Sequence, residues 1–547
     1  MNKRNTFESV KIDPKSEKIL AQFLEENPEV HKILTESAGE KEVYANLRKW
    51  ILDQIDEDSF ALKYYSNEIS GRDAFRKLKW KELGAIRILD YIDHEGMEYD
   101  DPNLRGERYY NYPIRILWLA VTQGIGGGRP PFFRDMLHLL RQINGKSHRE
   151  FPDQQRILEW MDRHPSGLDP EIVQIRQADR DRILNLFIRK IEEGEINGSF
   201  LELDPSWSHE KKFNKMLEWW DSKLFHLKMA IRSPELLNEM LDHSLDPDTM
   251  DVLYQAREAG IPFFVNPYYL SLMDTRANSK YIGADQAIRD YIIYSKELVE
   301  EFGHIVAWEK EDIVEAGKPN VAGWILPEGQ NIHRRYPDVA ILIPDSMGRA
   351  CGGLCASCQR MYDFQRGNLN FNLEKLKPGE TWPDKLQRLM EYFRNDSQLR
   401  DILITGGDAL MSSDKSLKRI LDAVYEMALN KKNDNESRPD GEKYAEMLRV
   451  RLGTRLPAYI PHRIDDALIK ILSQFKKKAS KIGIKQFVIQ THFETAMEVT
   501  PEAKKAVGKL ISAGWIVTNQ QVFTAAASRR GHTAKLRKVL NDIGVLP

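Results

Sequence analysis

Arg349-Ala350-Cys351-Gly352-Gly353-Leu354-Cys355-Ala356-Ser357-Cys358-Gln359-Arg360 is the stretch that contains all three cysteines of this 547-residue chain. Thiolates are soft ligands that select iron-sulfur clusters, zinc or copper, and this spacing lets one loop place three of them around one centre. A structural zinc site needs four protein ligands, and the nearest histidine, His333, lies well upstream. Three thiolates leave one iron of a 4Fe-4S cluster open to a small molecule. The loop therefore predicts a catalytic cluster, with inert or disulfide-paired cysteines as the alternative.

The composition gives no indication of a nucleic-acid or membrane partner. Lysine and arginine number 80 against 82 aspartates and glutamates, so there is no basic field that would favour nucleic acid. The N-terminus lacks the apolar segment of a signal peptide, and no apolar run approaches the roughly 18 residues of a membrane span. A reducing compartment also preserves free thiolates. We therefore expect a cytoplasmic protein with no membrane or nucleic-acid partner.

The first 215 residues predict a mostly α-helical region of unknown role. Apolar residues recur there at three- and four-residue spacing among dense charges. The loop at 124–131 is rich in glycine, but Arg129 replaces the last glycine of a dinucleotide-binding pattern, and Pro130-Pro131 should not let a helix begin. We expect a turn there. The region would bind a partner, form an oligomer contact or cover the rest of the chain.

Residues 216–338 predict a helical bridge between this region and the part that carries the cysteines. Asp246 is a suitable N-cap for a helix that starts at Pro247, and Gly260 is placed to end it. The aromatic side chains Tyr268 and Tyr269 are expected to lie in the core. A polar linker follows at 310–319.

Residues 339–547 predict an α/β fold. Five short apolar runs, at 339–343, 401–405, 448–452, 486–490 and 515–518, alternate with helical segments at 413–429, 464–479 and 500–513. Such alternation is typical of βα units in a parallel sheet. The active sites of these sheets lie at the carboxyl ends of the strands.

Polar residues follow four of these strands. The segments are Thr405-Gly406-Gly407-Asp408, Gly453-Thr454-Arg455, Gln490-Thr491-His492-Phe493 and Thr518-Asn519-Gln520. Paired glycines allow a close approach of the backbone, and a carboxylate can receive an ammonium group. A polar Asn-Gln pair at the tip of a buried strand is costly unless it is hydrogen-bonded. Each segment alone also fits a common turn, a surface ion pair or a core histidine.

The cysteine loop and these segments together resemble the radical SAM enzymes, and most closely the lysine 2,3-aminomutase family. The resemblance covers about residues 216–547 and includes the segment His333 to Ile343 before the loop. It implies an incomplete (β/α) barrel of about five parallel strands, with a 4Fe-4S cluster on Cys351, Cys355 and Cys358. It also implies S-adenosylmethionine (SAM) contacts from Thr405, Gly406, Gly407, Asp408, Arg455, His492, Asn519 and Gln520. Arg335 and Arg360 correspond to family arginines near pyridoxal phosphate (PLP) and the substrate carboxylate.

The chain also departs from the family. The lysine that holds PLP and the substrate carboxylates have no counterpart in this sequence, and Val339 replaces an arginine associated with the phosphate. PLP is therefore an open possibility whose lysine this chain does not supply. The sequence stops at Pro547, where the family enters a sixth strand, and an uncovered parallel edge is a pairing liability. We expect a lost segment, a partner chain, a second copy or the N-terminal helices to complete the barrel.

The sequence thus predicts a radical SAM enzyme that acts on an amino-acid-like substrate, with a flavodoxin- or ferredoxin-type electron donor. Such an enzyme cleaves SAM to a 5′-deoxyadenosyl radical, and an aminomutase would be an isomerase. Two alternatives stay open. One is a cluster- or zinc-bearing interaction protein with a decayed barrel, and the other is a truncated PLP-dependent aminomutase.

Overall fold

The computed structural model describes residues 8–75, 77–100, 108–147, 152–259, 261, 265–275, 281–302, 331–344 and 381–547. The chain forms two compact units, one of Met1–Pro102 with Gly106–Pro152 and one of Asn103–Arg105 with Asp153–Pro547. We describe each unit by itself. The division of the chain at residues 215 and 338 stays a prediction. None of the helices in the described ranges is long and apolar enough to cross a membrane.

The first unit is helical, as predicted, and has its own apolar core. Its helices are α1 (Pro14–Glu26), α2 (Pro28–Glu36), α3 (Glu40–Leu52), α4 (Phe60–Tyr65), α5 (Gly71–Phe75), α6 (Trp80–Asp93), α7 (Pro113–Gln123) and α8 (Pro130–Ile143), with a hairpin of β1 (Glu98–Asp100) and β2 (Arg108–Tyr110). Leu34, Leu89 and Phe133 lie at the centre of the core. Because each helix buries one apolar face there, helical spacing in the sequence was a sound guide.

The prediction that no helix begins at Pro130-Pro131 was wrong. Helix α8 starts at Pro130, with Arg129 as its extended N-cap. A proline at the first helical position lacks only an N–H that the helix does not use, and its fixed φ suits the helix. The turn before it is confirmed: Gly124 ends α7 in the left-handed region at φ +67°.

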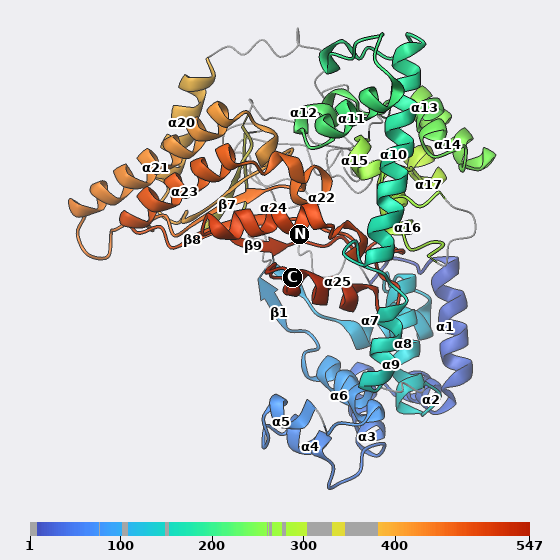
Figure 1. Cartoon of the computed structure of the whole chain (residues 1–547). Helices are drawn as coiled ribbons and strands as arrows, with labels where there is room; N and C mark the ends of the chain where they lie inside the picture. Colours follow the sequence, from blue (N-terminus) through green and yellow to red (C-terminus); the bar gives the residue numbers. More distant parts are fainter. Residues whose placement is uncertain are drawn as a thin grey trace. The chain divides into compact units, whose positions relative to one another are not determined.

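The second unit begins with helices that lead to the sheet (Figure 1). They are α9 (Gln154–Asp162), α10 (Pro170–Glu192), η2 (Ser199–Leu201), α11 (His209–Trp220), α12 (Lys223–Lys228), α13 (Pro234–Met240), α14 (Pro247–Glu258), α15 (Pro267–Leu270), α16 (Gln286–Ile292) and α17 (Lys296–Phe302). The Asp246 side chain caps α14 as predicted, by accepting from Thr249 N at 2.9 Å. Tyr268 and Tyr269 are buried in the core, also as predicted.

The sheet has six strands in the order β4-β5-β6-β7-β8-β9. They are β4 (Ile332–Tyr336), β5 (Val339–Leu342), β6 (Asp401–Ile404), β7 (Arg449–Gly453), β8 (Gln486–Thr491) and β9 (Ile516–Asn519). The strands β5 to β9 are parallel, which confirms the five predicted strands. The strand β4 was not predicted and runs antiparallel to β5. The mixed α/β class is thus confirmed, whereas closure into a radical SAM barrel stays a prediction.

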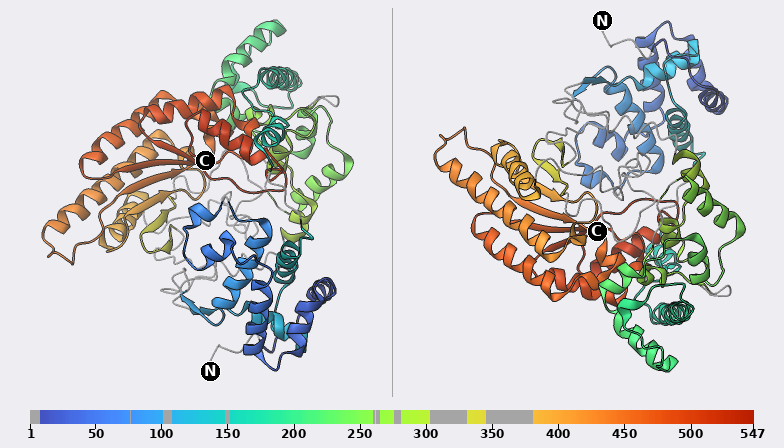
Figure 2. Two further views of the ribbon diagram at one scale, coloured as in Figure 1. Left: turned by 90° about the horizontal axis from the view of Figure 1, so that it is seen from below. Right: turned by 90° about the horizontal axis from the view of Figure 1, so that it is seen from above.

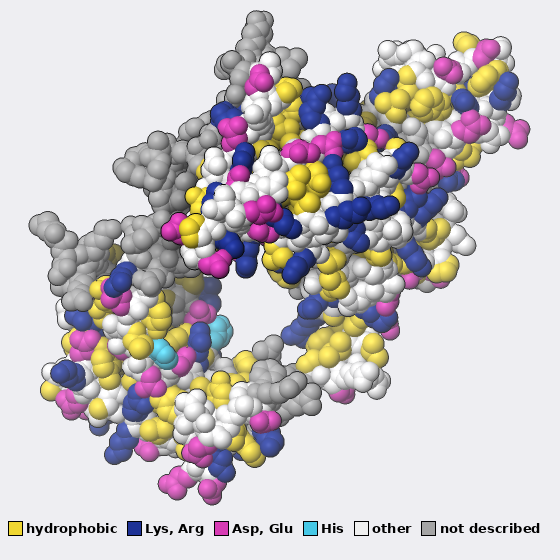
Figure 3. Space-filling view, turned by 90° about the vertical axis from the view of Figure 1, so that its left-hand side faces the viewer, with side chains coloured by type: hydrophobic (Ala, Val, Ile, Leu, Met, Phe, Trp, Pro, Cys, Tyr) yellow, Lys and Arg dark blue, Asp and Glu magenta, His cyan; other side chains and the backbone are white. Residues whose placement is uncertain are grey.

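Helices cover one face of this sheet (Figures 1 and 2). They are α20 (Trp382–Asn395), α21 (Asp414–Glu436), α23 (Asp466–Lys481) and α24 (Pro501–Ser512), and α25 (His532–Asp542) follows β9. Helix α23 shows why they pack this way: Leu468, Leu472 and Phe475 recur at helical spacing and are buried. Lys470 and Lys477 on its other side are exposed. Figure 3 shows many Lys and Arg side chains on the face of the molecule that is turned to the viewer.

Both edges of the parallel part of the sheet, β5 to β9, carry further backbone pairing. On one edge, β4 covers β5. On the other, Asn519 N donates to Leu546 O at 2.8 Å, and Leu546 N donates to Val517 O at 2.9 Å. Thr518 and Leu546 therefore form a parallel bridge beside β9.

Candidate functional site

The parallel register brings the predicted segments to one edge of the sheet. Ile404 pairs with Leu452, and Thr491 pairs with Asn519, so β6, β7, β8 and β9 end side by side. The predicted ligand-binding residues that the structure gathers at this edge are Thr405, Gly406, Gly407, Asp408, Arg455, His492, Asn519 and Gln520. The carboxyl edge of a parallel sheet is where ligands bind in open α/β folds.

Gly406 is a glycine that its position requires. Its φ is +109°, and a Cβ there would lie 2.4 Å from the side chain of Ile343, at the end of the neighbouring strand. The backbone at Gly406 therefore lies close to this strand, and the close approach to a ligand stays a prediction. A side chain at 406 would push the loop after β6 away from β5.

The carboxylate of Asp408 joins the loop after β6 to the loop after β7. It accepts hydrogen bonds from Leu410 N (2.9 Å), the Thr454 hydroxyl (2.7 Å) and Arg455 N (2.7 Å). Burial raises the pKa of Asp408, and these hydrogen bonds oppose that rise. The contact of Asp408 with an ammonium group stays a prediction, since a ligand would share oxygens that already hold the two loops together.

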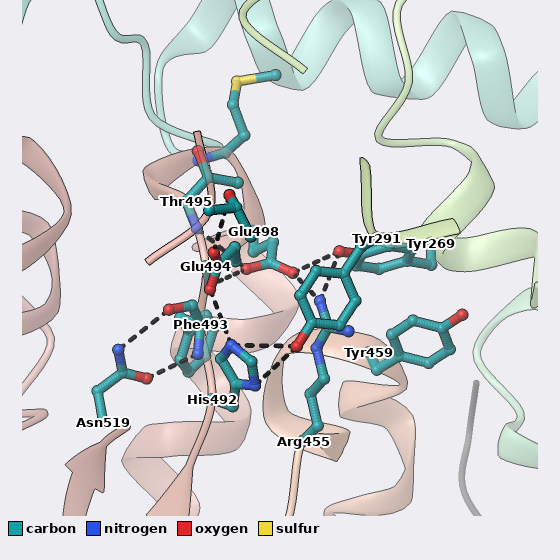
Figure 4. Close-up of polar contacts among 12 residues, drawn as sticks. Tyr269, Tyr291, Arg455, Tyr459, His492, Phe493, Glu494, Thr495, Glu498 and Asn519 are labelled. Carbon is teal, nitrogen blue, oxygen red and sulfur yellow. Dashed lines mark hydrogen bonds and ion pairs between the residues drawn. The ribbon is translucent and has the colours of Figure 1, made fainter. Parts of the chain in front are cut away.

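Arg455 lies in a buried ion pair with Glu498 (Figure 4). Its Nη2 donates to Glu498 Oε1 at 2.8 Å and to the Tyr269 hydroxyl at 2.8 Å. The Tyr269 hydroxyl donates to the same carboxylate oxygen at 2.6 Å. Glu498 comes from η6 (Ala496–Glu498), and Tyr269 comes from α15. The guanidinium therefore ties the loop after β7 to the loop after β8 and to the helical part before the sheet.

Three tyrosine rings surround this guanidinium. The Arg455 Cζ lies 3.4 Å from the ring centroid of Tyr291 and 5.2 Å from the centroids of Tyr269 and Tyr459. Aromatic faces stabilise a cation more strongly when water is excluded, as it is from these buried rings. The predicted role of Arg455 as a ligand contact is untested, while its observed contacts are those of a structural cation.

His492 is part of a second buried cluster beside the first. Its Nε2 lies 2.9 Å from Glu494 Oε2, and the Tyr291 hydroxyl lies 3.0 Å from its Nδ1 and 3.3 Å from its Nε2 (Figure 4). Burial, and then the charge of Arg455, lower the pKa of His492 to about 3. Burial, and then the charge of Glu498, raise the pKa of Glu494 to about 7. The imidazole is therefore neutral near pH 7, and its neighbour is a carboxyl group that titrates there.

Asn519 and Gln520 differ in how they are held. The Asn519 amide donates to Phe493 O at 3.0 Å and accepts from Phe493 N at 2.7 Å. The backbone of Phe493 therefore satisfies the amide of Asn519, so the burial of this amide does not by itself call for a ligand. The exposed Gln520 accepts a hydrogen bond from Gln490 on its side of the sheet.

Of the remaining predicted residues, Arg335 is the one that the described part of the chain includes, and it lies toward the opposite end of the sheet. Arg335 lies in a β-bulge of β4. The preceding Arg334 points to α20, where it pairs with Asp396 and Tyr392, and successive residues of a strand point to opposite faces. Cys351, Cys355, Cys358 and Arg360 lie outside the described residues, and their roles stay predictions.

Three residues of the edge were not predicted as site residues. Glu494 and Glu498 follow the segment with His492, so carboxylates within six residues of it were a usable signal. Tyr291 lies on α16, 201 residues before His492. Only the fold brings these two together.

The comparisons with known proteins agree with this arrangement. No family model matches the chain. An uncharacterized KamA family protein of Methanocaldococcus jannaschii is 26% identical over 95% of this chain and 77% of its own length. The L-lysine 2,3-aminomutase of Methanococcus maripaludis is 26% identical over 58% of this chain and 60% of its own length. The glutamate 2,3-aminomutase of Clostridioides difficile is 31% identical over 49% of this chain and 50% of its own length.

The chain thus spans less than two thirds of the length of these two aminomutases. The predicted family resemblance is nevertheless confirmed: the homologues of this chain are KamA-family and lysine 2,3-aminomutase proteins of the radical SAM superfamily.

Proposed function

We propose that this chain is a radical SAM enzyme, an isomerase of the aminomutase kind, that acts on an amino-acid-like small molecule. The observation that carries the proposal is the convergence of four polar strand ends on one carboxyl edge, in a chain whose homologues are aminomutases. SAM would lie along this edge. A flavodoxin- or ferredoxin-type protein would supply the electron.

The residues of the edge fit a polar ligand such as SAM. Thr405, His492 and Gln520 would supply hydrogen bonds, on a frame that Asp408 and Arg455 hold rigid through their own buried contacts. Cys351, Cys355 and Cys358 would hold the 4Fe-4S cluster. When bound, the cluster and SAM supply a 5′-deoxyadenosyl radical, while the protein supplies position and exclusion of water.

We assign no step to PLP. Val339 stands where the family has an arginine near the phosphate, and in the structure it pairs with Asp401 at the start of β5. An apolar side chain offers a phosphate no charge-assisted hydrogen bond.

The proposal is tested by anaerobic reconstitution of the full chain with iron and sulfide. We expect about four irons and four sulfides per chain, and cleavage of SAM to methionine and 5′-deoxyadenosine when dithionite is added. Cys358→Ala should abolish cleavage. Ser357→Ala, the adjacent residue in the same loop, keeps the three thiolates and should retain it.

Two results would overturn the proposal. One is about one zinc per chain with no iron or sulfide, which would indicate the interaction protein instead. The other is SAM cleavage by Cys358→Ala at the rate of the unchanged chain. Candidate substrates are then compared by transfer of label from 5′-deuterated SAM, with lysine and glutamate tested first.

A further inference from the structure

Among the residues that the structure describes, two buried carboxyl groups, Glu494 and Glu498, lie beside one arginine, Arg455. The guanidinium of Arg455 is paired with Glu498 at 2.8 Å. Glu494 is also fully buried, and its carboxylate meets a neutral imidazole at 2.9 Å. Two buried carboxylates thus share the field of one arginine.

Two acids so close to one cation do not both ionise easily. Glu498 is held by the ion pair and by hydrogen bonds from Tyr269 and the backbone. Glu494 accepts a weak hydrogen bond from the Thr524 hydroxyl at 3.4 Å and another from the backbone N–H of Val522. Burial and the charge of Glu498 place its pKa at about 7, although Arg455 opposes the rise. The groups that face Glu494 are therefore His492, Glu498, Arg455 and Thr524.

The proton of Glu494 has a direct consequence for the imidazole. A protonated Glu494 donates to His492 Nε2, so the imidazole must carry its own proton on Nδ1 and donate it toward the Tyr291 hydroxyl. An ionised Glu494 accepts from Nε2–H, so Nδ1 becomes an acceptor for the Tyr291 hydroxyl. In both states each hydrogen bond is kept, and only its direction changes.

We infer that Glu494 is a positioning residue that decides which ring nitrogen of His492 carries the proton. Through His492 it also sets the direction of the hydrogen bond to Tyr291 at the carboxyl edge of β8. The carboxyl edge thus has two hydrogen-bonding states of similar energy, which interconvert near neutral pH. A ligand that contacts this cluster would select one of them and would take up or release a proton as it binds.

The inference concerns the ligand-free chain and does not depend on the proposed radical chemistry. It is tested by NMR on the full-length protein with ¹⁵N-labelled histidine, in which the signals of His492 are assigned by their loss in His492→Gln. We expect the pattern of two-bond couplings to change from the Nδ1–H to the Nε2–H tautomer as the pH rises from 6 to 8. The imidazole should stay neutral throughout.

Two variants separate positioning from packing. Glu494→Gln keeps the shape of the side chain but cannot titrate, so His492 should keep one tautomer from pH 6 to 8. Glu502 lies on α24, and its carboxylate pairs with Arg176 of α10. Glu502→Gln removes this carboxylate and should leave the tautomer transition of His492 unchanged.

The inference is overturned if His492 in the unchanged chain keeps one tautomer over this range, a result that needs no variant. It is also overturned if Glu494→Gln shows the same transition as the unchanged chain. Failure of SAM cleavage would affect neither result.

Discussion

Glu498→Gln removes the negative charge from the buried pair that joins three parts of the second unit. The Glu498 side chain is fully buried, and that of Arg455 is 10% exposed. The Oε1 of Glu498 accepts from Arg455 and Tyr269, while Oε2 accepts from the backbone N–H groups of Glu494 and Thr495. Glutamine offers one oxygen and one NH₂ group, so its NH₂ must face either the two backbone N–H groups or Arg455 and the Tyr269 hydroxyl, and of these the hydroxyl alone can accept.

The expected loss of stability is about 3 kcal/mol. Removal of one partner of a buried ion pair costs about 3–5 kcal/mol, because the other charge is left unpaired. The lower figure applies here, since Glu494 stands beside the same arginine. Without the charge of Glu498, the pKa of Glu494 falls, and its ionised form provides Arg455 with a second carboxylate.

Urea unfolding followed by circular dichroism measures the change, with ΔG obtained by linear extrapolation. The matched control is Glu235→Gln, because Glu235 pairs with Arg257 at 2.8 Å while both side chains are about half exposed. An exposed pair contributes at most about 1 kcal/mol. The reasoning is refuted if Glu498→Gln loses no more stability than this control.

Three further predictions concern single groups of the second unit. In Gly531→Ala the new Cβ lies 2.4 Å from the Trp160 carbonyl, whereas in Gly283→Ala, at a similar positive φ, the new Cβ meets nothing within 4 Å. Thermal melting should show a loss of stability of about 1–2 kcal/mol for Gly283→Ala and a clearly larger loss for Gly531→Ala. Equal losses would contradict this. Asp408→Asn turns an NH₂ group toward Arg455 N and should lower the free energy of unfolding in urea by about 1–3 kcal/mol. Asp246→Asn keeps an N-cap of equal quality and should change this free energy little. Similar losses in both variants would argue against Asp408 as a buried acceptor. The pKa of Glu494 is raised in the folded chain, so between about pH 5 and 7 this carboxyl group ionises first in the unfolded chain. The stability of the unchanged chain relative to Glu494→Gln should therefore fall by roughly 1.4 kcal/mol per pH unit in this range and stay level above pH 7. A stability difference that is flat from pH 5 to 7 would contradict this.

The strands and helices of the second unit follow from local patterns. Helix α24 shows this well, since Thr500, Pro501 and Gly514 mark its ends in the sequence, and the Thr500 hydroxyl accepts from Ala503 N at 3.0 Å. The strand β4 could not be found in the same way. Its residues Ile332–Tyr336 are mostly polar, and only their pairing with β5 makes them a strand.

The strand-end segments were predicted to lie at one edge of the sheet, and they do, because neighbouring parallel strands all end at the same edge. What each side chain does there was beyond local patterns. The backbone of Phe493 satisfies the amide of Asn519, and Arg455 pairs with Tyr269, which lies 186 residues earlier in the chain. Partners of this kind depend on how distant loops pack, and the residues that surround Asn519 or Arg455 in the sequence do not indicate that packing. The ligand contacts of both residues stay predictions.

The same contacts divide the edge into two kinds of group. Asp408, Asn519 and Arg455 hold several buried hydrogen bonds each, so a ligand that displaced them would leave buried polar atoms unpaired, at about 1–3 kcal/mol for each atom. His492 can exchange donor for acceptor without loss of a hydrogen bond, because Glu494 and Tyr291 adjust with it. A ligand that binds this edge therefore meets a rigid frame and one adaptable group. We expect recognition to centre on His492 and its neighbours, and the frame to fix where the ligand lies.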